Sequence, residues 1–483
     1  MSSSKTGSSE TSSYDVVVVG GGLLGAGIAR DAAQRGLSAA LFEAADFGAG
    51  AAASGSRLAL GSLSALGTLD FTRVREDIRE REILLQTAPH LVRPQTCLVP
   101  FYSHGLLAQA RLRAELALSD ALGFDHALRV HQLLPAREAK KRVPVLNPDG
   151  LLGAALVWEA AIPEVERLAR ELAWDARHHG AVLHPHTRVE ELRRTPGRQG
   201  RERIGGVRWK NALTGEEGRT DAALVILAAG SGEYALSRER GKMRFHKAVF
   251  IAVSPLLGLR NALAFPQEDP PGLLLAVPHT DTCWAGSLTA AYHGDDSGSA
   301  VYATGAEVAA LMKALRAVLP GDALVPERAS ASVHAQILPG EEIHDPAANG
   351  GRCDGLLSAS GAGLTRFRRV AEDAVDLACR KLGRALSVPP CRTASTPLPP
   401  PHSCPEGSVA EAVECAVTEE DCLTLRDFLE RRVSHWSTAE RRAHLPAALE
   451  ALAKKLHWDE PRQAAEVKAW EAETALGQAF RVL

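Results

Sequence analysis

Aromatic residues are scarce in this chain of 483 residues, of which phenylalanine, tryptophan and tyrosine together make up 5%. Proteins that bind single-stranded nucleic acids stack bases on aromatic side chains, and this chain has few to offer. Positive charge is not in excess either, because 55 lysines and arginines face 58 aspartates and glutamates and leave a net charge of −3. The sequence therefore predicts no nucleic-acid partner that depends on neutralising phosphates.

Long apolar runs are also missing. None approaches the roughly 20 residues that a helix needs to span a bilayer, so no transmembrane segment is expected. Residues 1–13 are rich in serine and threonine and lack the apolar stretch of a secretory signal, which predicts a disordered tail. These features together favour a cytoplasmic protein.

Cysteine pairs of the kind that bind metals are absent. The eight cysteines form no Cys-x-x-Cys pair and have no histidine at ligand spacing, so the sequence predicts no metal site. Scattered thiols in a long chain are typical of a reducing compartment, and we expect free thiols rather than disulfides.

The chain has an ordinary globular balance of 45% hydrophobic and 23% charged residues, enough for a sizeable core. Its length predicts about three domains or two large ones. A Pro-rich stretch over 388–407 is expected to be a linker. It separates a main unit over 14–387 from a helical C-terminal domain over 408–483.

One motif carries specific chemistry. A valine-rich strand over 15–19 runs directly into Gly20-x-Gly22-x-x-Gly25, which opens a helix, and a second strand over 38–42 ends at Glu43. Such a turn lets a pyrophosphate approach the backbone at a helix N-terminus, and the carboxylate is placed to accept ribose hydroxyls. The pattern predicts a Rossmann-like dinucleotide site, and the alternative is a purely structural glycine turn.

The rest of the main unit alternates between helices and strands. Residues 246–334 alternate as strands around one helix, which predicts an antiparallel sheet carrying one face of a pocket. Helical spacing or strand-like runs are found at 72–87, 106–122, 163–179, 181–184, 205–209, 222–227, 305–319, 356–360 and 366–382.

Several stretches resemble the FAD-dependent glycerol-3-phosphate dehydrogenase family, within the wider D-amino-acid-oxidase-like flavoproteins. They are YDVVVVGGGLLGAGIARDAAQRGL (14–37), TAPHLVRP (87–94), HTRVEEL (186–192), NALTGEE (211–217), ILAAGSG (226–232), GLTRFRRVAEDAVDLACRKLG (363–383) and AVTEEDCLTLRDFLERR (416–432). The resemblance runs from residue 14 to about residue 460, and the APHLVRP and AEDAVD segments are specific to the family.

The resemblance implies an α/β fold (α+β overall), with a Rossmann-like FAD-binding domain, an antiparallel-sheet substrate domain and a C-terminal helical domain. It implies FAD as cofactor, with the glycine loop on its pyrophosphate, Glu43 on the ribose, the Val189 backbone on the adenine and Gly361 at the flavin end. The full set of implied FAD contacts is Gly20, Gly21, Gly22, Gly25, Glu43, Ser56, Val189, Ala229, Gly230, Gly361 and Leu364.

The substrate positions depart from the family pattern. Arg57 keeps the charge of a lysine, whereas histidine, arginine, tyrosine and lysine positions hold Leu60, Ser64, Ala65, Phe250, Leu338 and Gly363. Because a dianionic phosphate needs several fixed cations, these changes argue against ordinary glycerol-3-phosphate oxidation. The lost histidines also remove the obvious acceptors for the alcohol proton.

Other residues could substitute for the missing groups. His334 is a candidate base, and Arg57 and Arg366 are candidate anion-binding residues, against the alternatives of a structural histidine and a solvated arginine. We expect hydride transfer from an alcohol, either glycerol-3-phosphate or an altered substrate, to FAD. The alternative is a catalytically degenerate flavin-binding relative. The resemblance further implies a quinone as electron acceptor and peripheral contact with the inner face of a membrane.

Overall fold

The fold is taken from a computed structural model of the chain. The structure describes residues 12–66, 70–102, 106–122, 130–197, 200–232, 236, 243–254, 259–268, 271–279, 282–292, 301–319, 324–338, 341–348, 353–399, 407–433 and 436–481.

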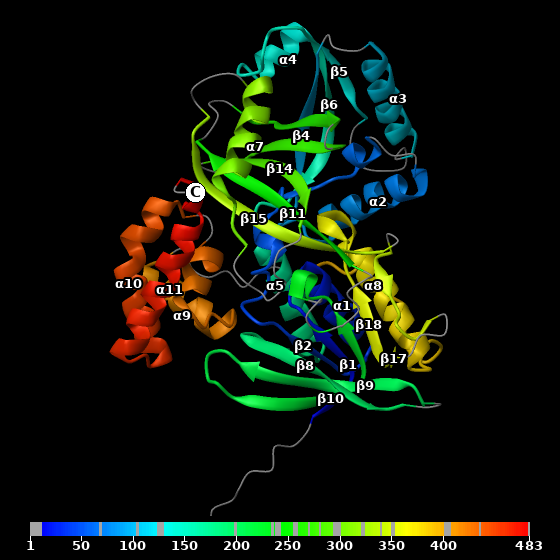
Figure 1. The fold of residues 1–483 in the computed structure, drawn as a ribbon, viewed down its shortest axis with the longest axis vertical. Coiled ribbons are helices and arrows are strands. Elements are labelled where there is room, and N and C mark those ends of the chain that lie inside the picture. Colours follow the sequence, from blue (N-terminus) through cyan, green and yellow to red (C-terminus); the bar gives the residue numbers. More distant parts are fainter. Residues whose placement is uncertain are drawn as a thin grey trace, which may run out of the picture.

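The first sheet forms the lower part of the molecule (Figure 1). Its strands follow the order β16-β18-β10-β1-β2-β7, and the run from β18 to β7 is parallel. Valines of β1 are fully buried on both faces, which is why this strand can lie in the centre of a parallel sheet. The strands are β1 (Ser13–Val19), β2 (Ala39–Phe42), β7 (Val182–His184), β8 (Thr187–Pro196), β9 (Glu202–Asn211), β10 (Glu217–Leu227), β16 (Ile343–His344), β17 (Cys353–Asp354) and β18 (Leu356–Ala359).

The expected disordered tail, residues 1–13, includes two residues that the structure places in contact with the first sheet. Ser13 already belongs to β1, and the carbonyl of Ser12 accepts the backbone N–H of Asp221 at 3.0 Å. Pairing with β10 therefore orders the chain earlier than its serine-rich composition predicts. Residues 1–11 lie outside the described residues.

Three helices pack together in this lower part. α1 contacts both α5 and α8, and small residues on its faces allow the close approach. These helices are α1 (Leu23–Gln34), α5 (Val165–His178) and α8 (Gly363–Lys381). The main hydrophobic core therefore lies around the helix that starts at the glycine loop.

The second sheet forms the upper part and follows the order β15-β11-β14-β13-β12-β4-β6-β3, with β5 beside β6. Most pairs are antiparallel, as expected, but the sheet also includes strands before residue 246, and β12 pairs with β4 in parallel. Its strands are β3 (Leu58–Ala59), β4 (Arg93–Tyr102), β5 (Gln132–Pro135), β6 (Leu151–Ala161), β11 (Met243–Val253), β12 (Ala262–Glu268), β13 (Pro271–Pro278), β14 (Cys283–Ala291) and β15 (Pro326–Ile337).

Helices and short turns cover this sheet. Side chains of α4 and α7 share one core with the sheet, and those of α3 and η2 share another. The elements are η1 (Ala51–Ser54), η2 (Ser62–Ala65), α2 (Phe71–Thr87), α3 (Leu106–Leu122), α4 (Ala136–Arg142), η4 (Gly230–Gly232) and α7 (Gly305–Val318).

The C-terminal helices lie to one side of both sheets, in orange and red in Figure 1, and have a core of their own. They are α9 (Val409–Glu419), the π-helical turn η7 (Asp427–Arg432), α10 (Thr438–Leu456), α11 (Glu460–Leu476) and the short η8 (Ala479–Arg481). Six of the described cysteines are free thiols, as expected, but Cys415 of α9 is disulfide-bonded, which corrects the expectation at that position.

The described part of the Pro-rich stretch lies against the main unit. Leu398 is 5% exposed, and its backbone N–H donates to the carbonyl of Thr87 at 2.7 Å. The carbonyl of Thr396 accepts from the Arg30 side chain at 2.9 Å. Residues 400–406 of this stretch lie outside the described residues.

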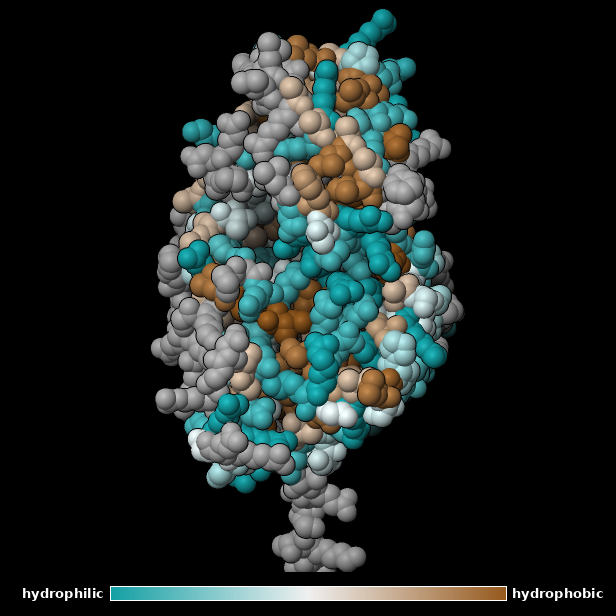
Figure 2. Space-filling model, turned by 90° about the vertical axis from the view of Figure 1, so that its right-hand side faces the viewer, coloured by the Kyte–Doolittle hydropathy of each residue, from teal (hydrophilic) through white to brown (hydrophobic). Residues whose placement is uncertain are grey.

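Among the described helices, none combines the length and the apolar character needed to cross a membrane. The face on the right of Figure 1 is shown in Figure 2, where hydrophilic side chains surround separate clusters of apolar ones.

Candidate FAD and substrate site

The glycine loop lies between the end of β1 and the start of α1, as its spacing predicts. Gly20 has a φ of +107°, and a Cβ there would lie 2.5 Å from the carbonyl oxygen of Ala228. A Cβ on Gly25 would lie 1.8 Å from the carbonyl oxygen of Gly20. Both positions require glycine because a side chain would separate backbones that must touch.

Gly22 is different, because a Cβ there would have no heavy atom within 4 Å. It is the N-cap of α1, and no side chain caps the helix. The first backbone hydrogen bond of the helix runs from Ala26 to Gly22, so the preceding N–H groups point toward the open space. Free N–H groups, the helix dipole and an open approach together fit the pyrophosphate of FAD.

Glu43 follows β2 and turns back toward the glycine loop. Its Oε2 accepts the backbone N–H of Gly21 at 2.6 Å, and its Oε1 accepts that of Ala45 at 2.8 Å. Burial raises the pKa of this carboxyl group, while the two N–H donors lower it. A carboxylate has about four lone-pair sites, so Glu43 retains acceptors for ribose hydroxyls.

The strand expected at the adenine lies beside the same turn. Thr187 of β8 donates its backbone N–H to the carbonyl of Glu43 at 2.6 Å. Val189, two residues further along, is 7% exposed and lies at a β-bulge. The fold therefore brings Val189 and Glu43 together, although 146 positions separate them in the sequence.

The residues expected at the flavin end come from three segments that meet. β15 lies against both η1, which Ser56 follows, and η4, which begins at Gly230. A Cβ on Gly361 would lie 3.9 Å from the carbonyl oxygen of Ala335 in β15. Gly230 and Gly361 have φ values of +58° and +79°, a conformation that favours glycine.

Two further predicted contacts lie next to these segments. Ala229 directly precedes η4, and its own preceding residue, Ala228, donates its N–H to the carbonyl of Val19 at 2.8 Å. Leu364 lies in the first turn of α8, whose N-cap Ala362 offers no side-chain hydrogen bond. The start of α8, like that of α1, is therefore left without a side-chain cap.

His334 lies on β15 opposite His246 of β11. Its Nε2 is 2.9 Å from the hydroxyl of Ser332. His334 is exposed to solvent, yet the surrounding protein partly desolvates its ring. This desolvation, together with the nearby His246, lowers the pKa of His334 below the ordinary value. A neutral imidazole beside the Ala335–Gly361 approach is suited to accept a proton.

Arg57 is held by its own neighbours. Its guanidinium donates to the carbonyl of Pro163, lies 3.4 Å from a carboxylate oxygen of Glu166 and sits 5.4 Å from the centre of the Trp284 ring. The backbone at Arg57 has a φ of +58°, which is uncommon for a residue with a side chain. These contacts balance its charge.

Arg366 lies in the first turn of α8 and is engaged by carboxylates. It donates to both oxygens of Glu342, at 2.9 and 2.8 Å, and to Glu76 at 2.7 Å. Asp77 approaches it at 3.7 Å, and burial raises the pKa of Asp77 to about 6. Carboxylates therefore surround Arg366, and its guanidinium is not free to bind an anion.

The first group of altered positions lies around η2. The carbonyl of Leu60 accepts the hydroxyl of Thr365 at 3.1 Å, which joins this turn to α8. Ser64 donates its hydroxyl to the carbonyl of Gly61 at 2.6 Å, and Ala65 ends η2. Leu60, Ser64 and Ala65 thus stand where the family pattern has charged or aromatic groups.

The second group contributes no charge. The ring of Phe250 is buried against the backbone of Gly286, where a Cβ would lie 2.5 Å from a ring carbon. Leu338 is half-buried just beyond β15. Gly363 has a φ of +60° at the start of α8, and a Cβ there would have no heavy atom within 4 Å. The start of α8 thus leaves space beside Gly363, and the lysine charge that the family pattern implies at this position is missing.

One buried ion pair at the site was not predicted. Glu159 of β6 is fully buried and accepts the backbone N–H groups of Gly61 and Leu63, each at 2.6 Å. Arg81 of α2 lies 3.2 Å from the same carboxylate. This pair fixes the turn that carries Leu60 and Ser64. The sequence feature that could have revealed this ion pair is the single glutamate within the apolar run of β6, because a buried carboxylate needs partners.

Within the described ranges, no group of three histidine, cysteine, aspartate or glutamate side chains is arranged to hold a metal ion.

Comparisons with known proteins agree with this geometry. A family model described as FAD dependent oxidoreductase matches residues 15–377. A glycerol-3-phosphate dehydrogenase from Synechocystis sp. is 29% identical over 425 residues, which cover 81% of this chain and 74% of that protein.

Solved structures share the fold. The structure of glycerol-3-phosphate dehydrogenase from Bacillus halodurans complexed with FAD has a TM-score of 0.76 at 21% identity, and the match covers 97% of this chain and 96% of that one. L-alpha-glycerophosphate oxidase from Mycoplasma pneumoniae with FAD bound has a TM-score of 0.63 at 16% identity, covering 80% and 100%.

The open glycine loop, the half-buried carboxylate of Glu43 and a family match over most of the chain all support FAD binding. This chain belongs to the family of FAD-dependent oxidoreductases.

Proposed function

We propose that this FAD-dependent oxidoreductase takes a hydride from the carbinol carbon of a small alcohol. The observation that carries the proposal is the open space above Gly22 at the uncapped start of α1, with Glu43 beside it. Relatives named glycerol-3-phosphate dehydrogenase support an alcohol as the substrate class.

When bound, FAD supplies the hydride acceptor. The chain would hold it with the N–H groups at the start of α1 on the pyrophosphate, Glu43 on the ribose and the backbone of Val189 along the adenine. The residues proposed at the flavin end are Ser56, Ala229, Gly230, Gly361 and Leu364.

His334 is the proposed general base. Hydride removal from an alcohol also requires loss of the hydroxyl proton, and a neutral imidazole can accept it. The lowered pKa of His334 keeps the ring neutral at neutral pH, and Ser332 steadies it through Nε2. The position beside the Ala335–Gly361 approach supports this role.

The substrate we favour carries little negative charge. Arg57 is balanced by Glu166, and Arg366 by Glu342 and Glu76, so neither guanidinium is available to a phosphate without breaking an ion pair. Charge-assisted hydrogen bonds to phosphate are worth about 1.5–3 kcal/mol each, and a dianion would forgo them here.

Anaerobic titration tests both points. The FAD-loaded protein is mixed with glycerol, with 1,2-propanediol and with glycerol-3-phosphate, and loss of the oxidised-flavin absorbance is followed. We expect the neutral alcohols to reduce the flavin at lower concentration than the phosphate ester. Reduction by glycerol-3-phosphate alone would refute the proposed substrate charge, and reduction by none of the three would refute alcohol oxidation.

The electron acceptor belongs to the same proposal. We propose a quinone as the electron acceptor of the protein, which would be cytoplasmic and contact the inner face of a membrane. Reoxidation of the substrate-reduced protein by a short-chain quinone, compared with reoxidation by oxygen, tests it. Reoxidation by oxygen that is faster than by the quinone would contradict this choice of acceptor.

A further inference from the structure

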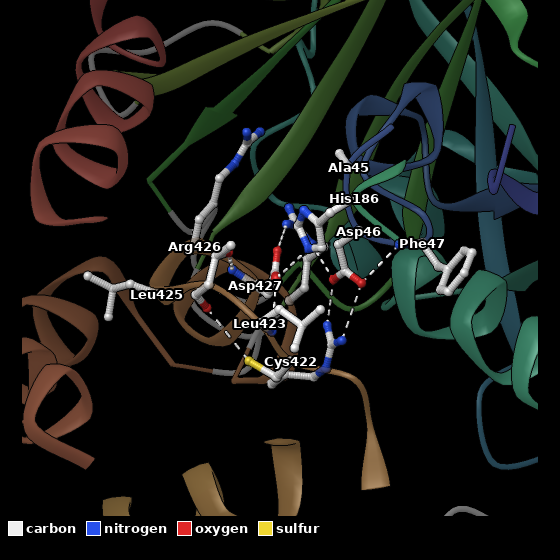
Figure 3. Close-up of polar contacts among 12 residues, drawn as sticks. Ala45, Asp46, Phe47, His186, Cys422, Leu423, Leu425, Arg426 and Asp427 are labelled. Carbon is white, nitrogen blue, oxygen red and sulfur yellow. Dashed lines mark hydrogen bonds and ion pairs between the residues drawn. The ribbon is translucent and has the colours of Figure 1, made fainter. Parts of the chain in front are cut away.

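The C-terminal helices contribute none of the expected FAD contacts, yet their π-helical turn η7 reaches the segment that follows Glu43 (Figure 3). Asp46 and Asp427 are both fully buried, and they meet two arginines of this turn. Buried carboxylates are costly unless paired, so this network fixes the two segments relative to each other.

Asp46 accepts hydrogen bonds from both arginines, Arg431 and Arg432. Its Oδ2 accepts Nε of Arg431 at 2.8 Å and Nη1 of Arg432 at 2.6 Å. Its Oδ1 accepts the backbone N–H of Phe47 at 2.9 Å, so the same carboxylate also shapes its own turn. Phe47 in turn packs on the glycine loop, since a Cβ on Gly21 would lie 2.5 Å from its ring.

Asp427 connects η7 to the other side of that turn. Its Oδ1 accepts Nη2 of Arg431 at 2.6 Å, and its Oδ2 lies 2.9 Å from Nε2 of His186. The backbone N–H of His186 donates to the carbonyl of Ala45 at 2.8 Å. His186 has a φ of +50°, so this bond and its side-chain contact hold an uncommon backbone conformation.

The chain of contacts ends at the carboxylate that faces the ribose. Ala45 donates its N–H to Oε1 of Glu43, and Thr187, the neighbour of His186, donates to the carbonyl of Glu43. Asp427 therefore reaches Glu43 through His186 and Ala45, in a sequence of hydrogen bonds of 2.8 to 2.9 Å. The close-up in Figure 3 shows Asp427, His186, Ala45 and Asp46 gathered at this point.

We propose that Asp427 is a positioning residue for FAD. It acts through His186 and Ala45 to hold Glu43 where the ribose binds, so that FAD affinity depends on a domain that does not touch the cofactor. This inference rests on the proposed role of Glu43.

A double-mutant cycle on FAD affinity tests it. Dissociation constants for FAD are measured on apoprotein for Asp427→Asn, Glu43→Gln and the double variant, with circular dichroism as a check on folding. Asp421→Asn is the matched control, because Asp421 pairs with Arg177 of α5 and so also joins the C-terminal helices to the main unit, away from Glu43. His186→Asn interrupts the same path and replaces Asp427→Asn if that variant does not fold.

We expect Asp427→Asn to weaken FAD binding about tenfold, a usual size for coupling between sites. Glu43→Gln should weaken it at least as much, and the double variant should be no weaker than Glu43→Gln alone. Asp421→Asn should bind like the parent protein. The inference would be overturned if the two single substitutions weakened FAD binding independently, so that their effects multiplied in the double variant. It would also be overturned if Asp427→Asn left the affinity for FAD unchanged. An unchanged affinity in Glu43→Gln would overturn the proposed role of Glu43 itself and the inference with it.

Discussion

Replacement of Gly22 by alanine is expected to weaken FAD binding without changing the stability of the fold. Gly22 has φ −72° and ψ −176°, an extended conformation that alanine adopts readily. Among the described residues, no heavy atom lies within 4 Å of an added Cβ, so Gly22→Ala is expected to fold normally. The same Cβ would stand in the space that the pyrophosphate needs to reach the N–H groups of α1.

The size of the loss follows from those contacts. Each hydrogen bond between a backbone N–H and a phosphate is charge-assisted and worth about 1.5–3 kcal/mol. Losing two of them costs about 3–6 kcal/mol, which weakens FAD binding by about 10²–10⁴-fold. Gly25→Ala should instead prevent folding, because its Cβ would lie 1.8 Å from the carbonyl oxygen of Gly20.

The assay is the FAD dissociation constant of the apoprotein, with thermal unfolding measured in parallel. Gly272→Ala is the control, because Gly272 is an exposed strand residue of the other sheet whose Cβ would also meet no heavy atom within 4 Å. We expect equal melting temperatures for the three folded proteins and weak FAD binding in Gly22→Ala alone. FAD binding by Gly22→Ala within threefold of the parent would refute the assignment of this space to the pyrophosphate.

Three further outcomes are expected. Burial raises the pKa of Asp77 to about 6, so the folded chain binds this proton more tightly than the unfolded chain and loses stability as pH rises from about 4 to 6. In urea unfolding, Asp77→Asn should therefore have a free energy of unfolding about 2–3 kcal/mol above that of the parent at about pH 8. Near pH 3 the two proteins should be equally stable. Glu159→Gln should lower the free energy of unfolding by about 3–5 kcal/mol in the same assay, because Arg81 loses one of its two buried carboxylate partners. A loss smaller than about 1 kcal/mol would contradict the structural role. His334→Gln should slow flavin reduction by the alcohol about 10²–10⁴-fold with unchanged FAD affinity, whereas an unchanged rate would exclude His334 as the base.

Local spacing was enough to predict the cofactor loop. The order of strand, glycine turn, helix and second strand is set within about thirty residues. Gly20 and Gly25 are required sterically by the fold, whereas Gly22 leaves the space that we assign to the pyrophosphate. The helices at 106–122 and 305–319 were also close to their observed bounds, because each has its own apolar periodicity.

Ion-pair partners could not be predicted in the same way. Arg431 meets Asp46 across 385 residues, and Arg366 meets Glu342 and Glu76 from different elements. Nothing in the sequence near an arginine indicates which distant carboxylate it will meet, since that depends on how sheets and helices pack. For this reason Arg366 was a candidate anion site in the sequence and is a balanced cation in the structure.

The strand pairing of the second sheet could not be predicted from the sequence either. Residues 246–334 were expected to form it, but β3 to β6 also belong to it, and β4 pairs with β12 over a long sequence separation. Alternation of polar and apolar residues predicts strands but not their partners, because every strand with one buried face satisfies the pattern equally.

The most direct test of the account is the flavin content of the protein purified under native conditions. The open helix start at Gly22 and the half-buried carboxylate of Glu43 predict about one FAD per chain, released on denaturation and restored when apoprotein is mixed with FAD. A protein without flavin absorbance, which also fails to take up FAD, would contradict the central claim that this loop holds FAD.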